Sequence, residues 1–185
     1  MNLFEFLMIL LSLIVGLGIA EILTGVARSL KKDGVQGFSW LHGTISMIVF
    51  LGLLQTFWES WGLRSIDEWS FPAMLFMLGS PILLYLIAHV MFPEDEEFDS
   101  LEDYYFKRAR LIWILAGLTV VVGTLFRPVA FDMPLFVADN ASAIPTLVVC
   151  VLLSISNARW LHRTLVPMAM ILVLLDTLAI SYSIG

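Results

Sequence analysis

Six long apolar runs dominate this sequence, and they decide what the chain can fold into. A membrane helix needs about 20 mostly apolar residues to cross hydrocarbon about 30 Å thick. Four of the six runs contain no Asp, Glu, Lys or Arg. The runs cover residues 3–27, 38–58, 69–92, 111–126, 141–158 and 165–184. They predict an all-α, polytopic membrane helix bundle with six transmembrane helices, forming one membrane domain over residues 1–185.

The composition agrees with this prediction. Hydrophobic residues make up 59% of the chain and charged residues 14%, against about 45–50% and about 25% in a typical soluble domain. The mean hydropathy is +0.92. Runs 111–126 and 141–158 are short for a span, and we expect interfacial Arg and Trp side chains to extend them. Five spans is the alternative count.

The positions of the ten Lys and Arg residues predict the orientation. Eight of them follow the first, third or fifth run: Arg28, Lys31, Lys32, Lys107, Arg108, Arg110, Arg159 and Arg163. The even-numbered connections contain only Arg64 and Arg127. Basic residues favour the cytoplasmic side. We therefore expect the N-terminus and C-terminus outside and the odd connections in the cytoplasm, in a bacterial-type inner (plasma) membrane.

The segment 93–110 is the largest predicted cytoplasmic connection, and it is strongly acidic at its start. Ser100 and Asp103 have the spacing of a capping box, so we expect the fourth helix to begin near Leu101. The acidic run lacks the glycine and the alternating ligands of a calcium loop, which favours a solvated loop. The net charge of −6 gives no basic surface for nucleic acid, so none is expected as a partner.

Two acidic residues inside the runs are the leading functional candidates, because charged groups in a membrane are costly and usually have a role. Glu21 lies about 10 Å inside Arg28 along a helix, at 1.5 Å per residue. Asp176 lies near the middle of the last run. Gly18 and Gly25 share one helix face with Glu21, which predicts close packing of another helix against that face.

The sequence does not determine the hydrogen-bond or ion-pair partners of these two acids. Candidate donors to Glu21 are Thr24, Arg28, Ser46, Gln55 and Tyr85. Glu21 and Asp176 are then either protonated and hydrogen-bonded between helices, or sites for a proton or cation, or, for Glu21, paired with an inward-reaching Arg28.

The three histidines form a second candidate group. His42 opens the second run, His89 lies one turn before the end of the third, and His162 falls in the fifth connection, so all three are expected on the cytoplasmic side. Neutral imidazoles suit metal or haem iron. No two of them have the i, i+3 or i+4 spacing of a helical metal pair, and interfacial hydrogen bonding is the competing interpretation.

No catalytic motif is found: the sequence has no phosphate-binding glycine motif, no nucleophile elbow and no H-E-x-x-H. The single Cys150 suits a packing role. We therefore expect a non-enzymatic bundle without a cofactor, acting as an accessory or scaffold subunit in the lipid bilayer, as a homo-oligomer or in a larger membrane complex. The alternatives are a small proton- or cation-coupled transporter or channel that uses Glu21 and Asp176, and a metal or haem protein that uses the histidines.

Overall fold

The computed structural model describes residues 3–33, 39–64, 66, 69–93, 100–132, 134–135 and 141–183. All regular elements in these residues are helices. They are α1 (Leu3–Asp33), α2 (Trp40–Ser60), the 3-10 turn η2 (Trp61–Leu63), α3 (Phe71–Val90), α4 (Leu101–Phe131), α5 (Ala143–Ile155) and α6 (Arg159–Ser183).

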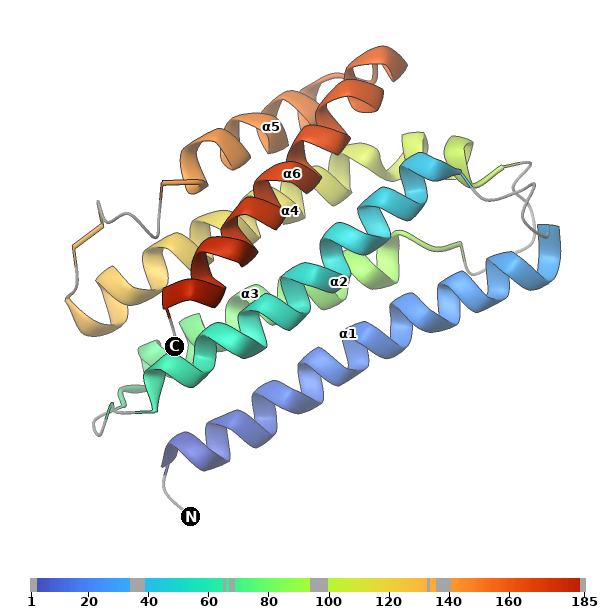
Figure 1. Cartoon of the computed structure of the whole chain (residues 1–185). Coiled ribbons are helices and arrows are strands. Elements are labelled where there is room, and N and C mark those ends of the chain that lie inside the picture. Colours follow the sequence, from blue (N-terminus) through green and yellow to red (C-terminus); the bar gives the residue numbers. More distant parts are fainter. Residues whose placement is uncertain are drawn as a thin grey trace.

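The six α-helices run back and forth along a common direction and form a ring (Figure 1). Around the ring, α1 packs against α3, α3 against α4, α4 against α5, α5 against α6, α6 against α2, and α2 against α1. Helix α2 also touches α3 and α4 across the ring. Because the direction alternates, α1 begins and α6 ends at the same end of the bundle.

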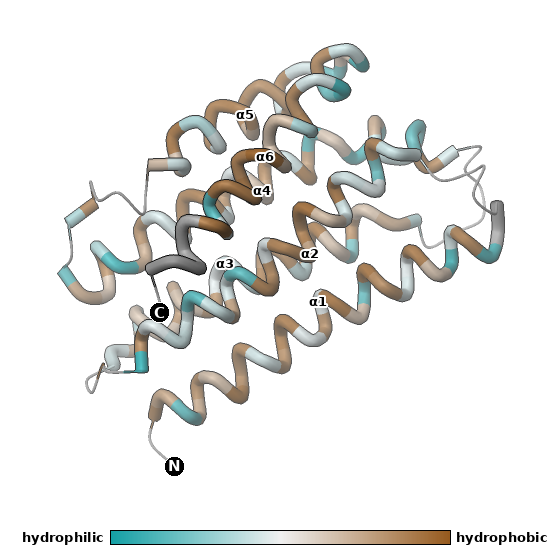
Figure 2. The backbone as a smooth tube through the Cα atoms, in the orientation of Figure 1, coloured by the Kyte–Doolittle hydropathy of each residue, from teal (hydrophilic) through white to brown (hydrophobic). Residues whose placement is uncertain are grey.

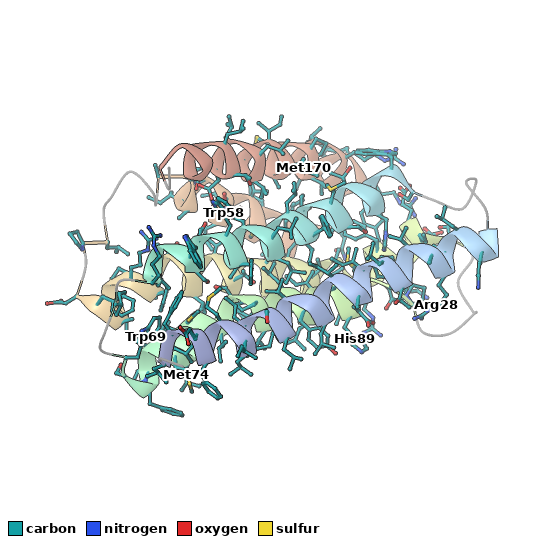
Figure 3. All side chains as sticks on the ribbon, turned by 60° about the horizontal axis from the view of Figure 1, so that its bottom comes forward. Arg28, Trp58, Trp69, Met74, His89 and Met170 are labelled. Carbon is teal, nitrogen blue, oxygen red and sulfur yellow. The ribbon has the colours of Figure 1, made fainter. Side chains whose placement is uncertain are left out.

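We name the two ends of the bundle by labelled residues. The Arg28 end is where α1, α3 and α5 finish; the Trp58 end is where α2, α4 and α6 finish. Figure 3 places Arg28 and His89 toward the first end and Trp58 and Trp69 toward the second.

The outside of the bundle is apolar. Large hydrophobic side chains are exposed on every helix, and on α1 they recur along one face at Leu13, Leu17 and Leu23, each more than half exposed. Figure 2 shows hydrophobic residues along the middle of the helices and more hydrophilic ones toward their ends. An apolar surface this continuous needs a nonaqueous surrounding. Among the described residues, five helices are long and apolar enough to span a membrane, and the fold is that of a membrane protein.

Two helix starts follow from local chemistry. Ser100 Oγ accepts the Asp103 backbone N–H at 3.1 Å and donates to Asp103 Oδ2 at 2.8 Å, which confirms the predicted cap and the start of α4 at Leu101. Ser70 Oγ accepts the Ala73 N–H in the same way at the start of α3.

Helix lengths differ from the predicted runs in both directions. Helix α4 extends beyond the apolar run 111–126 at both ends: its polar first turns begin at Leu101, as the predicted cap requires, and the helix continues to Phe131. Helix α6 begins at Arg159, not near residue 165. Helix α5 has only 13 residues, so it is about 20 Å long at 1.5 Å per residue, shorter than the predicted run 141–158.

Candidate functional site

A cavity of about 260 Å³ lies inside the ring, between α2, α4, α5 and α6, with α3 closing one side. Its polar lining includes Gln55, Glu59, Ser142 and Asp176. The remainder of the wall is mostly aliphatic, with Trp113 and Cys150 among the lining residues. An apolar cavity with a few converging polar groups is the usual form of a small-ligand site.

Asp176 on α6 is the centre of the polar lining, and both of its carboxylate oxygens accept hydrogen bonds. Gln55 on α2 donates through Nε2 to Asp176 Oδ2 at 2.7 Å. Ser142, just before α5, donates through Oγ to Asp176 Oδ1 at 2.8 Å. The carboxylate of Asp176 therefore joins α6 to α2 and to the residue that precedes α5.

Gln55 also links Asp176 to a second acid. Its Nε2 lies 3.1 Å from Glu59 Oε1, one helical turn further along α2. Because carboxylate oxygens only accept, the amide nitrogen must face both acids. The Thr177 hydroxyl, 3.4 Å from Gln55 Oε1, fits this orientation. One amide thus donates to two carboxylates.

The charge of Asp176 is met only by neutral donors among the residues that the structure describes. Its hydrogen bonds come from Gln55 and Ser142, and no described Lys or Arg forms an ion pair with it. Asp176 is half-buried and lies on the cavity wall. A buried or partly buried carboxylate without a counter-charge favours a proton or a cation in the adjoining space.

Ser142 lies directly before α5 and contacts this carboxylate. Ser142 occupies the N-cap position, but its side chain makes no capping hydrogen bond and donates to Asp176. Asp139 and Asn140, whose side chains could also cap this helix, lie outside the described residues. Ser142, whose hydroxyl could cap α5, therefore contacts Asp176 instead.

Glu21 lies elsewhere. Its Oε1 is 3.0 Å from His89 Nδ1 on α3, and the two side chains are 31% and 46% exposed. Glu21 does not line the cavity, so the structure does not bring Glu21 and Asp176 together. The glycines beside it behave as predicted: a Cβ on Gly18 would contact Leu53 of α2, and a Cβ on Gly25 would contact Phe92.

The other candidate partners of Glu21 are found in different contacts. Arg28 Nη1 donates to the Pro93 carbonyl at 3.4 Å. Tyr85 stacks on the ring of His89, with centroids 6.3 Å apart. Gln55 belongs to the Asp176 cluster. The partner of Glu21 is His89, which the sequence placed in the metal group.

The histidines occupy three separate environments near the Arg28 end. His42 is buried and its Nε2 is 2.7 Å from the Met91 carbonyl; His89 meets Glu21; His162 is buried in the first turn of α6, not in a connection as predicted. Because Arg159 and Arg163 lie outside the apolar run, the sequence did not predict this helical turn. The described residues contain no group of three His, Cys, Asp or Glu side chains that could hold a metal.

His162 belongs to a buried hydrogen-bond chain. Its Nε2 lies 2.7 Å from the Ser156 carbonyl, so Nε2 carries the hydrogen and Nδ1 accepts. Tyr105 donates its hydroxyl to Nδ1 at 2.5 Å, and Trp113 Nε1 donates to the Tyr105 oxygen at 2.8 Å. Both imidazole nitrogens are therefore occupied. Tyr105 and Trp113 lie eight residues apart on one helix face, a signal the sequence contained.

The fold and the cavity together define a class: an all-α bundle of membrane-protein helices around an acid-lined internal cavity. No protein-family model, curated protein or solved structure matches the chain.

Proposed function

We propose that this chain is a multi-pass membrane protein whose cavity receives a proton or small cation at Asp176, as a small transporter or channel. One observation carries the proposal. Asp176 faces the cavity with neutral donors on both oxygens and a second acid, Glu59, held beside it through Gln55. The Asp176 carboxylate thus places negative charge on the wall of a mostly apolar cavity.

The proposed insertion has six membrane-crossing segments, with the Arg28 end in the cytoplasm. Its support is the distribution of charge: eight of the ten Lys and Arg residues lie in the last turns of α1, the first turns of α4 or the first turns of α6. In this orientation the Asp176 cluster lies near the outer side. Helix α5 serves as the fifth crossing segment although it is short.

The site residues of this proposal differ from those expected from sequence. Asp176 and Gln55 remain, and Glu59 and Ser142 join them. Glu21 is paired with His89 outside the cavity, so it has no part in the proposed binding step and serves as a control.

Flux through reconstituted protein tests the proposal. Proteoliposomes containing a pH-sensitive dye, or a sodium-sensitive dye, report proton or sodium entry driven by an imposed gradient. We expect Asp176→Asn to lower the flux at least tenfold, because the amide removes the charge but keeps the size. Glu21→Gln should leave the flux within twofold. Wild-type vesicles no leakier than empty ones, or equal flux in Asp176→Asn, would refute transport at this site.

An accessory or scaffold subunit is the second candidate, and a specific observation favours it. Both membrane acids have partners on neighbouring helices: Glu21 has His89, and Asp176 has Gln55 and Ser142. Such contacts stabilise helix packing in membranes. This function predicts co-purification with a larger membrane complex in mild detergent, or a stable homo-oligomer. A monodisperse monomer with measurable flux would decide for transport.

A further inference from the structure

We propose that the ligand of this cavity is a linear organic ammonium ion, with its charged head at Asp176 and its alkyl chain directed toward Trp113. This inference rests on the proposed cation site and names the class of cation that the site takes. It follows from the shape of the cavity, the position of its charge and the nature of its far end.

The lining of the cavity is elongated along the helices. On α2 its lining runs from Ile45 to Glu59, which is about 21 Å at 1.5 Å per residue. On α4 the lining runs from Ile112 to Thr124, or about 18 Å. A volume of about 260 Å³ is small for a lining of this length, which favours a linear ligand over a bulky one. Because a dry cavity of about 150 Å³ holds benzene, this one holds about ten non-hydrogen atoms.

The charged end suits an ammonium head. An ammonium group has three donors and no acceptor, whereas the acids Asp176 and Glu59 only accept. Each oxygen of Asp176 has one described donor, and a carboxylate oxygen accepts a further hydrogen bond. An anion would meet the Asp176 carboxylate here, and a neutral ligand would leave Asp176 without a counter-charge.

The other end suits an alkyl chain and not a hydrated inorganic ion. Ile45, Val49 and Ile112 line it together with Ala116 and Trp113. The indole N–H of Trp113 already donates to Tyr105, so Trp113 offers the cavity only carbon surface. A bare metal cation at Asp176 would leave this apolar length unfilled, whereas each buried methylene of a chain contributes to binding.

Calorimetric titration of the whole protein in phosphatidylcholine nanodiscs tests the inference, with the heat of empty nanodiscs subtracted. The probes are n-hexylammonium, methylammonium, sodium and n-hexanol. Burial of a methylene corresponds to about fourfold in affinity, or ~0.8 kcal/mol. We expect n-hexylammonium to bind at least tenfold more tightly than methylammonium and n-hexanol.

Three variants test the binding of the ammonium head group and of the alkyl chain separately. Asp176→Asn should weaken n-hexylammonium at least tenfold, and Glu21→Gln, an acid outside the cavity, should not change it. Ala116→Leu fills the apolar part and should remove the advantage of n-hexylammonium over methylammonium. Since Ala116 is remote from the carboxylates, this variant tests the chain site even where Asp176→Asn fails to fold.

The outcomes distinguish this inference from the proposed cation site. If sodium and methylammonium bind as tightly as n-hexylammonium and all are lost in Asp176→Asn, the cation site stands and the alkyl inference is overturned. If n-hexylammonium binds equally to wild type and Asp176→Asn, or n-hexanol binds as well, the probes only dissolve in apolar surroundings and both proposals fail.

Discussion

Tyr105→Phe should destabilise the protein far more than the same change at the neighbouring Tyr104. The Tyr105 hydroxyl accepts from Trp113 and donates to His162. All three side chains are buried, with exposed fractions of 1% for Tyr105, 4% for Trp113 and 0% for His162. Phenylalanine fills the same space but leaves an indole N–H and an imidazole nitrogen without a partner.

The magnitude follows from these two orphaned groups. A buried polar group that loses its partner costs about 1–3 kcal/mol, so two groups cost about 2–6 kcal/mol. Polar contacts between membrane helices average only about 0.6 kcal/mol, which favours the lower part of this range. We therefore expect Tyr105→Phe to lower the free energy of unfolding by about 2–4 kcal/mol.

Tyr104→Phe is the matched control. The Tyr104 hydroxyl donates to the Val90 carbonyl at 3.0 Å and lies 3.3 Å from the Phe92 carbonyl, and both of these partners are acceptors. We expect a loss of about 0.5–1.5 kcal/mol, the net contribution of an ordinary hydrogen bond. Thermal unfolding in mild detergent, followed by circular dichroism, compares the two variants. Since 1 kcal/mol shifts the Tm of a chain this long by about 2–4 °C, the difference is measurable.

A double variant separates the orphaned groups from the lost hydrogen bonds. Adding Trp113→Phe to Tyr105→Phe removes the indole N–H as well, so the combined loss should be smaller than the sum of the two single losses. Equal losses for Tyr105→Phe and Tyr104→Phe, together with strict additivity in the double variant, would refute the hydrogen-bond chain as a stabilising unit.

Two further predictions concern packing and charge. Gly25→Ala should destabilise the protein by about 1–3 kcal/mol through overpacking, because the new Cβ would lie 2.2 Å from the Phe92 ring. Gly16→Ala is the control: a Cβ at Gly16 would have nothing within 4 Å, so this variant should be neutral or stabilising. Equal shifts in Tm for the two variants would contradict the prediction. Cys150, the only cysteine and a cavity-lining residue, should react at least tenfold faster with aminoethyl methanethiosulfonate than with its sulfonatoethyl counterpart. Mass spectrometry gives both rates, and the preference should disappear in Asp176→Asn; equal rates in wild type would count against an acidic cavity.

Most of the fold was predictable because the information is local. Long apolar runs identify the helices, and Ser100 with Asp103 identifies the start of α4 to within a residue. The errors in the predicted helix bounds lie where a helix extends beyond the apolar part that lies in the hydrocarbon. Polar turns such as Arg159 to Arg163 continue α6 beyond its apolar run, so His162 was assigned to a connection although it is helical and buried.

The site was predictable only in part, because its contacts join distant segments. Asp176 and Gln55 stood out as polar residues within apolar runs, but they are 121 residues apart in sequence, and nothing local pairs them. Glu59 lies one turn from Gln55 on α2, a spacing that predicts contact, yet its relevance depends on Asp176. Likewise, Glu21 and His89 were both predicted as site residues, but in two different hypotheses. Their contact depends on the packing of α1 on α3, which the sequence does not show.

The 13-residue length of α5 has a consequence for the lipid around the protein. Inserted as proposed, this helix covers about 20 Å of hydrocarbon about 30 Å thick. The bilayer therefore has a hydrophobic mismatch beside α5, whereas the other helices of the ring are longer. Lipids beside α5 must thin or tilt to match it. We expect the protein to prefer thin bilayers, and reconstitution in lipids of increasing acyl-chain length should lower its stability progressively.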